Sequence, residues 1–349
     1  MNVATEARPT MGTTTRTVEP CLTVSGLDIA YGTGIPVVSD FSLTVAPGET
    51  VGLIGESGCG KSSVGLALLG LLPETAQVSA RALDIAGQDV LDATDRDFQR
   101  LRGREIGMIF QEPMSALNPC TRIGPQIAEV LRLHGLADKK TANARALELL
   151  QLVQVPEPEL RMKQFPHQLS GGMRQRIVIA MALAARPKVL VADEPTTALD
   201  VTVQAQILRL LAQIQQDSGA GMVLISHDLG VIAENCDRVV VMYAGQIIEQ
   251  GTPEAVLSAP AHPYTAGLLA SIPTLAGERG GDLSTIPGGI AAEDRARPGC
   301  RFAPRCALAG PECEVQLPLQ ALTGDHDVRC VKSLVPVGYS AAPTSEDVT

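Results

Sequence analysis

Residues 50–72 read TVGLIGESGCGKSSVGLALLGLL, and this stretch decides the fold. It opens with a short continuous apolar run, which is typical of a strand buried on both faces of a sheet. A glycine-rich loop follows, and an apolar stretch of helical character comes directly after it. Residues 55–62 match the pattern G-x-x-x-x-G-K-[ST]. The strand before this pattern and the helix after it predict a phosphate-binding loop, or P-loop.

The residue types of this loop are suited to hold the phosphates of a nucleotide. Its glycines let successive backbone N–H groups turn inward, and the following helix adds the positive end of its dipole. Lys61 supplies a point charge for the β- and γ-phosphates, and the hydroxyl of Ser62 is an oxygen ligand for Mg²⁺. We expect the nucleotide to contact the whole run of Gly55, Glu56, Ser57, Gly58, Cys59, Gly60, Lys61, Ser62 and Ser63.

A second apolar strand, at 189–192, ends in the two carboxylates Asp193 and Glu194. Adjacent side chains of a strand point to opposite faces, so the two carboxylates need not share a role. Asp193 suits Mg²⁺, directly or through water, and Glu194 is free to polarise the attacking water as a base. An acidic helix N-cap is the alternative for such a pair on its own. The P-loop earlier in the chain favours the magnesium site.

Between residues 22 and 251, short β-type runs alternate with helical stretches, which predicts an α/β fold with a largely parallel sheet. Runs near the start of this region instead predict hairpin strands. After Gly251 the alternation of strand and helix patterns ends, and seven prolines lie between residues 253 and 304. We therefore expect a disordered tail at 1–20, a nucleotide-binding domain at 21–255 with a helical subdomain at about 112–172, a C-terminal extension at 256–335 and a disordered end at 336–349.

Composition excludes several classes of protein. The 349-residue chain has 28 basic and 38 acidic side chains, a net charge of −10, which is a poor match for nucleic acid. No apolar run approaches the ~18 residues of a membrane-spanning helix. The N-terminus is rich in Thr and has no apolar region typical of a secretory signal. We expect a cytoplasmic protein that can sit on a membrane partner.

Together with these motifs, LSGGMRQR at 169–176 resembles the signature of the ATP-binding-cassette (ABC) transporter ATPases. The resemblance implies a P-loop NTPase core with an antiparallel β subdomain, a helical subdomain and a small Cys-containing C-terminal extension. In this family two cassettes pack head to tail, and each ATP lies between one P-loop and the other subunit's signature. It implies that Ser170, Gly171 and Gly172, which precede a predicted helix, form a second anion site for the partner cassette's nucleotide.

Four further positions match the family residue by residue. Gln111 in MIFQEP corresponds to the Q-loop, which touches Mg²⁺ or water, so the implied magnesium set is Ser62, Gln111 and Asp193. Asp200 in TALD matches the loop that crosses the dimer interface, and His227 in ISHD matches the histidine that contacts the γ-phosphate. Tyr31 in IAYG matches the aromatic that stacks on adenine, a contact worth ~1–3 kcal/mol. The implied catalytic residues are Glu194, His227 and Gln111.

The strings HPYTAGLL and CRFAPRC narrow the resemblance to the dipeptide, oligopeptide and nickel importer subfamily. It implies an ATP-hydrolysing subunit that energises peptide uptake from the cytoplasmic face of the membrane. The implied partners are two membrane permeases, a second and different cassette, and an extracytoplasmic substrate-binding protein. Nickel, glutathione or oligosaccharide cargo remains an alternative. A soluble cassette acting on ribosomes or in DNA repair is more distant, because the chain has one P-loop and an acidic balance.

Four cysteines, Cys300, Cys306, Cys313 and Cys330, lie close together in the extension. In a reducing compartment such a group favours metal binding over disulfides, and four thiolates can hold zinc or an iron–sulfur cluster. Spacing alone does not choose between the two, and four unligated thiols remain an alternative. The subfamily resemblance implies a [4Fe-4S] cluster. His326 is a candidate replacement ligand, and Arg301, Arg305 and Arg329 are candidates to ease the cluster's negative charge.

Overall fold

The computed structural model describes residues 19–335, apart from 33, 198, 272–285 and 323. The tails expected at 1–20 and 336–349 therefore fall almost wholly outside the described residues. Within the described part of the chain, no helix is both long and apolar enough to cross a bilayer.

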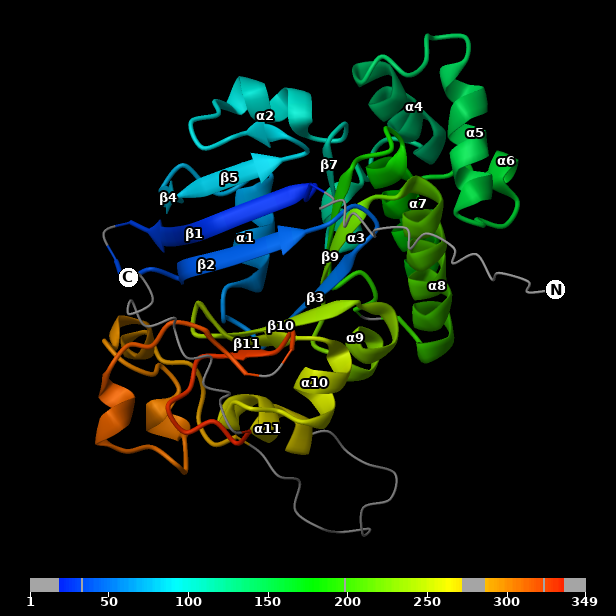
Figure 1. The fold of residues 1–349 in the computed structure, drawn as a ribbon. Helices are drawn as coiled ribbons and strands as arrows, with labels where there is room; N and C mark the ends of the chain where they lie inside the picture. Colours follow the sequence, from blue (N-terminus) through cyan, green and yellow to red (C-terminus); the bar gives the residue numbers. More distant parts are fainter. Residues whose placement is uncertain (1–18, 33, 198, 272–285, 323, 336–349) are drawn as a thin grey trace, which may run out of the picture.

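Two sheets form the framework of the molecule (Figure 1). The smaller sheet is antiparallel in the order β2-β1-β5-β6, and β4 pairs with β1. Alternating burial along β1 explains why this sequence forms a strand, because one face lies on the core and the other outside. Its strands are β1 (Leu22–Tyr31), β2 (Val38–Val45), β4 (Ala76–Ser79), β5 (Ala82–Ile85) and β6 (Gln88–Asp89).

The larger sheet has the order β12-β13-β11-β10-β3-β9-β8-β7. Its five strands from β10 to β7 are parallel, and the three at the other edge pair antiparallel. The predicted α/β class is thereby confirmed. Its strands are β3 (Thr50–Ile54), β7 (Ile106–Ile109), β8 (Val189–Asp193), β9 (Gly221–Ile225), β10 (Arg238–Tyr243), β11 (Gln246–Gly251), β12 (Gln320–Ala321) and β13 (Asp327–Val328).

Helices cover both faces of this sheet and form a separate group at one end (Figure 1). The cassette helices are α1 (Lys61–Leu68), α2 (Asp95–Leu101), α7 (Gly171–Leu183), α8 (Val201–Ser218) and α9 (Leu229–Asn235). The group at one end comprises α3 (Pro113–Ala116), α4 (Ile123–Leu133), α5 (Ala142–Leu152) and α6 (Pro158–Arg161), followed by a 3-10 turn, η1 (Pro166–Gln168).

The C-terminal extension is built from short elements. It begins with α10 (Pro253–Ser258) and α11 (Pro263–Ala270), each with a proline at its start that suits the first helical turn. Three 3-10 turns follow, at Glu293–Ala296, Ala303–Arg305 and Pro311–Glu314. The pairing of β13 with β11 joins this extension to the large sheet.

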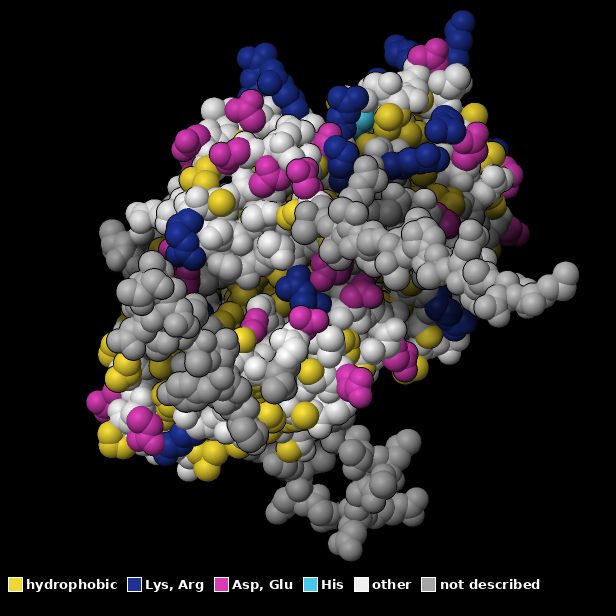
Figure 2. Space-filling view, in the orientation of Figure 1, with side chains coloured by type: hydrophobic (Ala, Val, Ile, Leu, Met, Phe, Trp, Pro, Cys, Tyr) yellow, Lys and Arg dark blue, Asp and Glu magenta, His cyan; other side chains and the backbone are white. Residues whose placement is uncertain are grey.

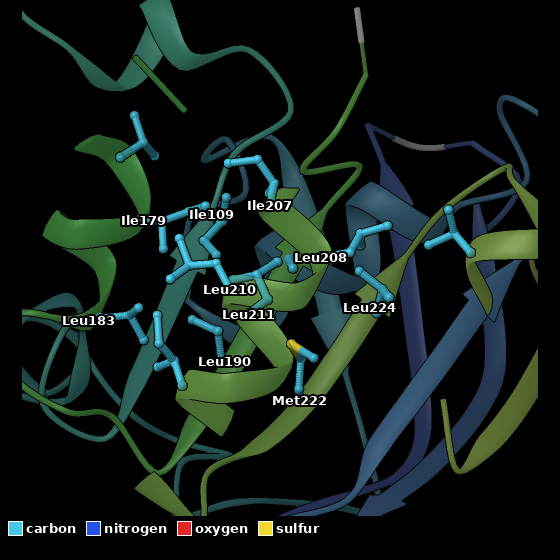
Figure 3. Close-up of a cluster of buried hydrophobic side chains, with 14 of the residues drawn as sticks. Ile109, Ile179, Leu183, Leu190, Ile207, Leu208, Leu210, Leu211, Met222 and Leu224 are labelled. Atoms are coloured by element: carbon cyan, nitrogen blue, oxygen red, sulfur yellow. The ribbon is translucent and has the colours of Figure 1, made fainter. Parts of the chain in front are cut away.

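Alternation along the parallel strands divides the core into two clusters. In β8, Val189 and Val191 belong to the cluster with α1 and the small sheet, and Leu190 and Ala192 belong to the cluster with α7 and α8. Figure 3 shows side chains of the second cluster, to which α7 contributes Ile179, α8 contributes Leu211, and the sheet contributes Leu190 and Met222. A strand buried on both faces reads as a continuous apolar run, as β8 does.

Parallel strands place their carboxyl ends at one edge of the sheet. The P-loop follows β3, Glu194 follows β8, His227 comes two residues after β9, and Gln111 comes two residues after β7. Strand order β3-β9-β8-β7 therefore gathers four sequence motifs from across the chain into one site.

Candidate functional site

The P-loop of residues 55–62 has the backbone conformation that its glycines predict. Gly55, Gly58 and Gly60 all have positive φ, at 149°, 80° and 111°. A Cβ on Gly55 would stand 2.2 Å from the carbonyl oxygen of Met242, so a side chain there would collide with β10. Helix α1 then starts at Lys61, and its N-terminus faces the loop as an anion site.

Lys61 is buried under this loop and bridges its two ends. Its Nζ donates to the carbonyl oxygens of Gly55 at 2.7 Å and Glu56 at 3.1 Å. The buried Cys59 lies beside it, with 3.7 Å between Nζ and Sγ. Burial raises the pKa of the Cys59 thiol, and Lys61 acts in the other direction. Cys59 therefore contributes a neutral side chain to the floor of the loop.

Asp193 has the properties expected of a magnesium ligand. Its side chain is buried, and burial raises the pKa of its carboxyl group, while a hydrogen bond from Ser62 and the charge of Lys61 lower it. One carboxylate oxygen, Oδ1, is buried without a hydrogen-bond partner among the described residues. Such an atom needs a cation or water, so the pairing of Asp193 with Ser62 fits Mg²⁺.

Glu194 is the point on which three donors converge. Its Oε2 accepts from Gln111 Nε2 at 3.0 Å and from Thr197 Oγ1 at 2.8 Å, and His227 Nδ1 lies 3.2 Å away. Its own backbone has a φ of +45°, in the left-handed region that a non-glycine residue rarely adopts. The strand end thus turns the carboxylate toward the side chains that follow β7 and β9.

The structure thereby brings together the predicted Glu194, Gln111 and His227. Thr197 is the contact that the sequence reasoning missed as a site residue, although it is the first residue of the quoted string TALD. Its position three residues after Glu194 was the available signal. Tyr31 also lies at this site, because its hydroxyl is 3.1 Å from Ser63 Oγ at the first turn of α1.

The signature residues stand apart from these contacts. Ser170 caps α7, with its Oγ accepting from Met173 N, and Asp200 caps α8 by accepting from Val203 N. A Cβ on Gly172 would be 2.7 Å from Val203 Cγ1, so the two helix starts are adjacent. Ser170 and Gly171 are exposed, and in the described part of the chain no hydrogen bond joins them to the P-loop. Ala198, beside Asp200, is not described.

The four clustered cysteines line a single cavity in the C-terminal extension, together with residues that include His262 and Phe302. All four are free thiols. Burial and the mutual proximity of the thiols raise the pKa of Cys330 to about 11. Within the described residues, no three His, Cys, Asp or Glu side chains are grouped closely enough to hold a metal ion.

All four predicted neighbours of these cysteines have other hydrogen-bond partners. His326, a candidate ligand, is buried with its Nε2 2.8 Å from Glu249 Oε1, because β11 and β13 bring the two together. Arg305 does not line the cavity and binds Glu56 instead. Arg301 and Arg329 do line it, but they donate to backbone carbonyl oxygens of Ala244 and Ile247.

Charge is mixed on the face of the molecule seen in Figure 2, where Lys and Arg are interspersed with Asp and Glu. Hydrophobic side chains gather toward the lower left, where Figure 1 places the C-terminal extension. Exposed apolar residues of that extension are Leu308, Val315, Val331 and Leu334.

A P-loop at the carboxyl edge of a parallel sheet, with a carboxylate pair at the end of β8 in the same sheet, defines a P-loop ATPase. The chain belongs to the ABC transporter family and is an ATP-hydrolysing cassette. Residues 38–197 match the family model described as ABC transporter, and residues 248–313 match the oligopeptide/dipeptide transporter, C-terminal region.

Curated relatives support this assignment over most of the chain. A putative peptide import ATP-binding protein of Brucella melitensis is 46% identical over 314 residues, which cover 89% of this chain and 94% of that protein. The oligopeptide transport ATP-binding protein AppD of Bacillus subtilis is 47% identical over 298 residues, 85% of this chain and 90% of that protein.

Among solved structures, the chain is similar to the ATP-binding cassette MJ0796 in a dimeric post-hydrolysis state bound to ADP and Pi. The TM-score is 0.58 at 27% identity, covering 66% of this chain and 98% of that one.

Proposed function

We propose that this chain is the ATP-hydrolysing subunit of an importer for dipeptides and oligopeptides. The observation that carries the ATPase part is the convergence of Gln111, Thr197 and His227 on the Glu194 carboxylate. The match of residues 248–313 to the oligopeptide/dipeptide transporter C-terminal region, and the names of the relatives, support the peptide cargo.

In this proposal the P-loop amides and Lys61 bind the β- and γ-phosphates, and Tyr31 stacks on the adenine ring. Ser62, Asp193 and Gln111 hold Mg²⁺, which when bound offsets phosphate charge. Glu194 orients and deprotonates the attacking water, and His227 contacts the γ-phosphate while holding the Glu194 carboxylate in place. The exposed Ser170 and Gly171 and the half-buried Gly172, with Asp200 at the adjacent helix start, would complete the site of a second cassette.

The chain would act at the cytoplasmic face of the membrane, bound to two permeases and paired with a second, different cassette. Closure around ATP and reopening after hydrolysis would drive alternating access in the permeases. Peptides would be delivered by an extracytoplasmic substrate-binding protein and would not touch this chain.

The test is transport by the reassembled complex in liposomes. Cassettes, permeases and binding protein encoded beside this gene are reconstituted, and ATP-dependent uptake of labelled di- and oligopeptides is measured. We expect peptide uptake that disappears in a matched complex carrying Glu194→Gln. Nickel, glutathione and oligosaccharides are assayed in parallel. Uptake of one of these without peptide uptake would refute the cargo and leave the ATPase assignment intact.

We also propose that Cys300, Cys306, Cys313 and Cys330 hold a [4Fe-4S] cluster. Their shared cavity supports a bound group, since four thiols gathered in one place are chemically suited to iron. A single zinc ion would instead need all four sulfurs at ~2.3 Å from one point. The cluster would supply a covalent link between segments that have little regular structure.

Analysis of anaerobically purified protein tests the cluster. We expect brown protein with four irons and four sulfides per chain, and loss of colour in Cys313→Ser. The matched control is Cys120→Ser, an exposed cysteine far from the cavity in sequence, which should keep the colour. Colourless protein containing zinc, or no metal after reconstitution, would contradict the proposal.

A further inference from the structure

Arg305 of the C-terminal extension reaches the P-loop, and its guanidinium forms a bidentate ion pair with the carboxylate of Glu56. Nη1 donates to Glu56 Oε2 at 2.7 Å, and Nη2 donates to Oε1 at 2.9 Å. The arginine side chain is 7% exposed and the glutamate side chain 24%. A bidentate pair that is largely shielded from water is stronger and more directional than a surface ion pair.

The remaining donors of Arg305 fix its position. Nε donates to the carbonyl oxygen of Pro287 at 2.8 Å, and Nη1 also donates to Tyr243 Oη at 3.2 Å. Nη2 also reaches the carbonyl oxygens of Ile286 and Gly288, both at 3.3 Å. Hydrogen bonds to the extension therefore fix the orientation of the guanidinium, and two of its N–H groups point at the carboxylate of Glu56.

Glu56 is held through its backbone as well. Its N–H donates to the hydroxyl of Tyr264 in α11 at 2.8 Å, and its carbonyl oxygen accepts from Lys61 Nζ at 3.1 Å. Two residues further on, the carbonyl oxygen of Gly58 accepts from Arg295 Nη2 at 2.8 Å. Three side chains of the extension, Arg295, Arg305 and Tyr264, thus bind the half of the loop that precedes Gly60.

Two physical effects follow for nucleotide binding. The glycines of the loop leave its backbone free to adopt many conformations, so contacts from outside must hold the N–H groups ready for phosphate. In addition, a free carboxylate at position 56 would repel the phosphates, and Arg305 neutralises it.

We infer that Arg305 and Tyr264 are positioning residues of the nucleotide site, and that the C-terminal extension holds the P-loop in its phosphate-binding shape. Loss of either contact should weaken nucleotide binding without removing a group that touches the nucleotide. This inference rests on nucleotide binding at the P-loop and is independent of the transported cargo.

The test measures the Kd of fluorescent ADP with Mg²⁺ in the purified chain, and the steady-state constants for ATP in the reassembled complex. We expect Arg305→Ala to raise the Kd and the KM for ATP about tenfold or more, with kcat changed much less. Arg305→Lys keeps the charge and loses the fork, and Tyr264→Phe loses only the hydroxyl, so both should show smaller increases in the same direction.

Comparing Arg305→Ala with a double variant separates two effects of Arg305, namely support of the loop backbone and neutralisation of the Glu56 charge. If repulsion by Glu56 were the whole effect, Glu56→Ala added to Arg305→Ala would restore the wild-type Kd. We expect the double variant to stay weak, because the loop is still unsupported. Should Arg305→Ala fail to fold, Arg305→Lys and Tyr264→Phe decide the question by the same measurement.

The matched control is Arg238→Lys. Arg238 forms a half-buried pair with Glu49, 3.0 Å from Nε to Oε1, at the opposite end of β3 from the P-loop. It should leave the Kd at the wild-type value. Wild-type nucleotide binding in the Arg305 and Tyr264 variants, or an equal loss in Arg238→Lys, would overturn the inference. Loss of binding in Lys61→Ala alongside wild-type binding in those variants would leave the nucleotide site standing.

Discussion

At the scale of single residues, the site depends on how a few polar groups are held by backbone atoms. The Lys61 side chain is buried beneath the P-loop backbone, and its ammonium group donates hydrogen bonds to the carbonyl oxygens of two residues of that loop. A cation held on neutral carbonyls is available to phosphate oxygens, because charge-assisted bonds to an anion are stronger.

Lys61→Ala should therefore weaken ATP binding by about tenfold or more. Equilibrium titration with a fluorescent nucleotide measures the change. Lys188→Ala is the control, because the exposed Lys188 pairs with the half-buried Glu105 and takes no part in the P-loop. This variant should bind nucleotide as the wild type does. An unchanged affinity in Lys61→Ala would count against the assignment of residues 55–62.

At the scale of elements, α11 depends on a buried histidine at its start. His262 Nδ1 accepts from Tyr264 N at 3.0 Å and so caps the helix that supports Glu56. Burial lowers the pKa of His262 to about 3. The folded protein keeps this ring neutral at pH values where the unfolded chain, with an ordinary pKa of ~6.5, takes up a proton.

The free energy of unfolding should therefore fall as the pH drops from about 6.5 toward 3, by up to ~1.4 kcal/mol per pH unit. His262→Asn keeps a side-chain acceptor at the cap and has no proton to gain. Urea unfolding of the wild type and of His262→Asn is measured at pH 7.5, 6.0 and 5.0. As the pH falls, the free energy of unfolding should decrease more steeply in the wild type than in His262→Asn. Glu249 and His326 are present in both, so the difference isolates His262. Parallel pH profiles would contradict the neutral, buried state of this ring.

At the scale of the whole molecule, the signature at the start of α7 lies on the surface, and we propose that it serves the nucleotide of a second cassette. Ser170 and Gly171 are exposed at the N-terminus of a 13-residue helix, where backbone N–H groups can bind an anion. The related cassette MJ0796 is described as dimeric in its solved structures. A second cassette that faces this helix start would bring the missing phosphate.

Glu194→Gln should bind ATP, stop hydrolysis and trap the closed pair of cassettes. Light scattering after gel filtration with Mg²⁺ and ATP measures the mass of this pair. For the chain alone it should show twice the mass of the chain. For the chain mixed with the partner cassette it should show the sum of the two masses. Adding Ser170→Arg should return the protein to single cassettes, because the bulky side chain blocks the anion site. Normal turnover in Glu194→Gln would remove this residue from the role of base.

The sequence by itself determined the strand, loop and helix around residues 50–72, because this motif is contiguous in the chain and lies between an apolar strand pattern and an apolar helical pattern. The family resemblance of its motifs also implied that Glu194, Gln111 and His227 act in one site, and the parallel strands that precede them bring the three together at one edge of the sheet. The small strands at 76–89 and the two short helices after residue 251 were too short to show a periodic pattern in the sequence. The role of Thr197 depends on its contact with Glu194, which no periodic pattern predicts.

Only the tertiary structure decided what supports the loop. Arg305 lies 249 residues from Glu56, and Tyr264 lies 208 residues away. No spacing rule links positions so far apart, because their meeting depends on how the extension packs beside β10 and β11. The same packing paired His326 with Glu249 and turned Arg305 away from the cysteines. Local motifs thus follow from local chain geometry, whereas these contacts exist only once the whole sheet has formed.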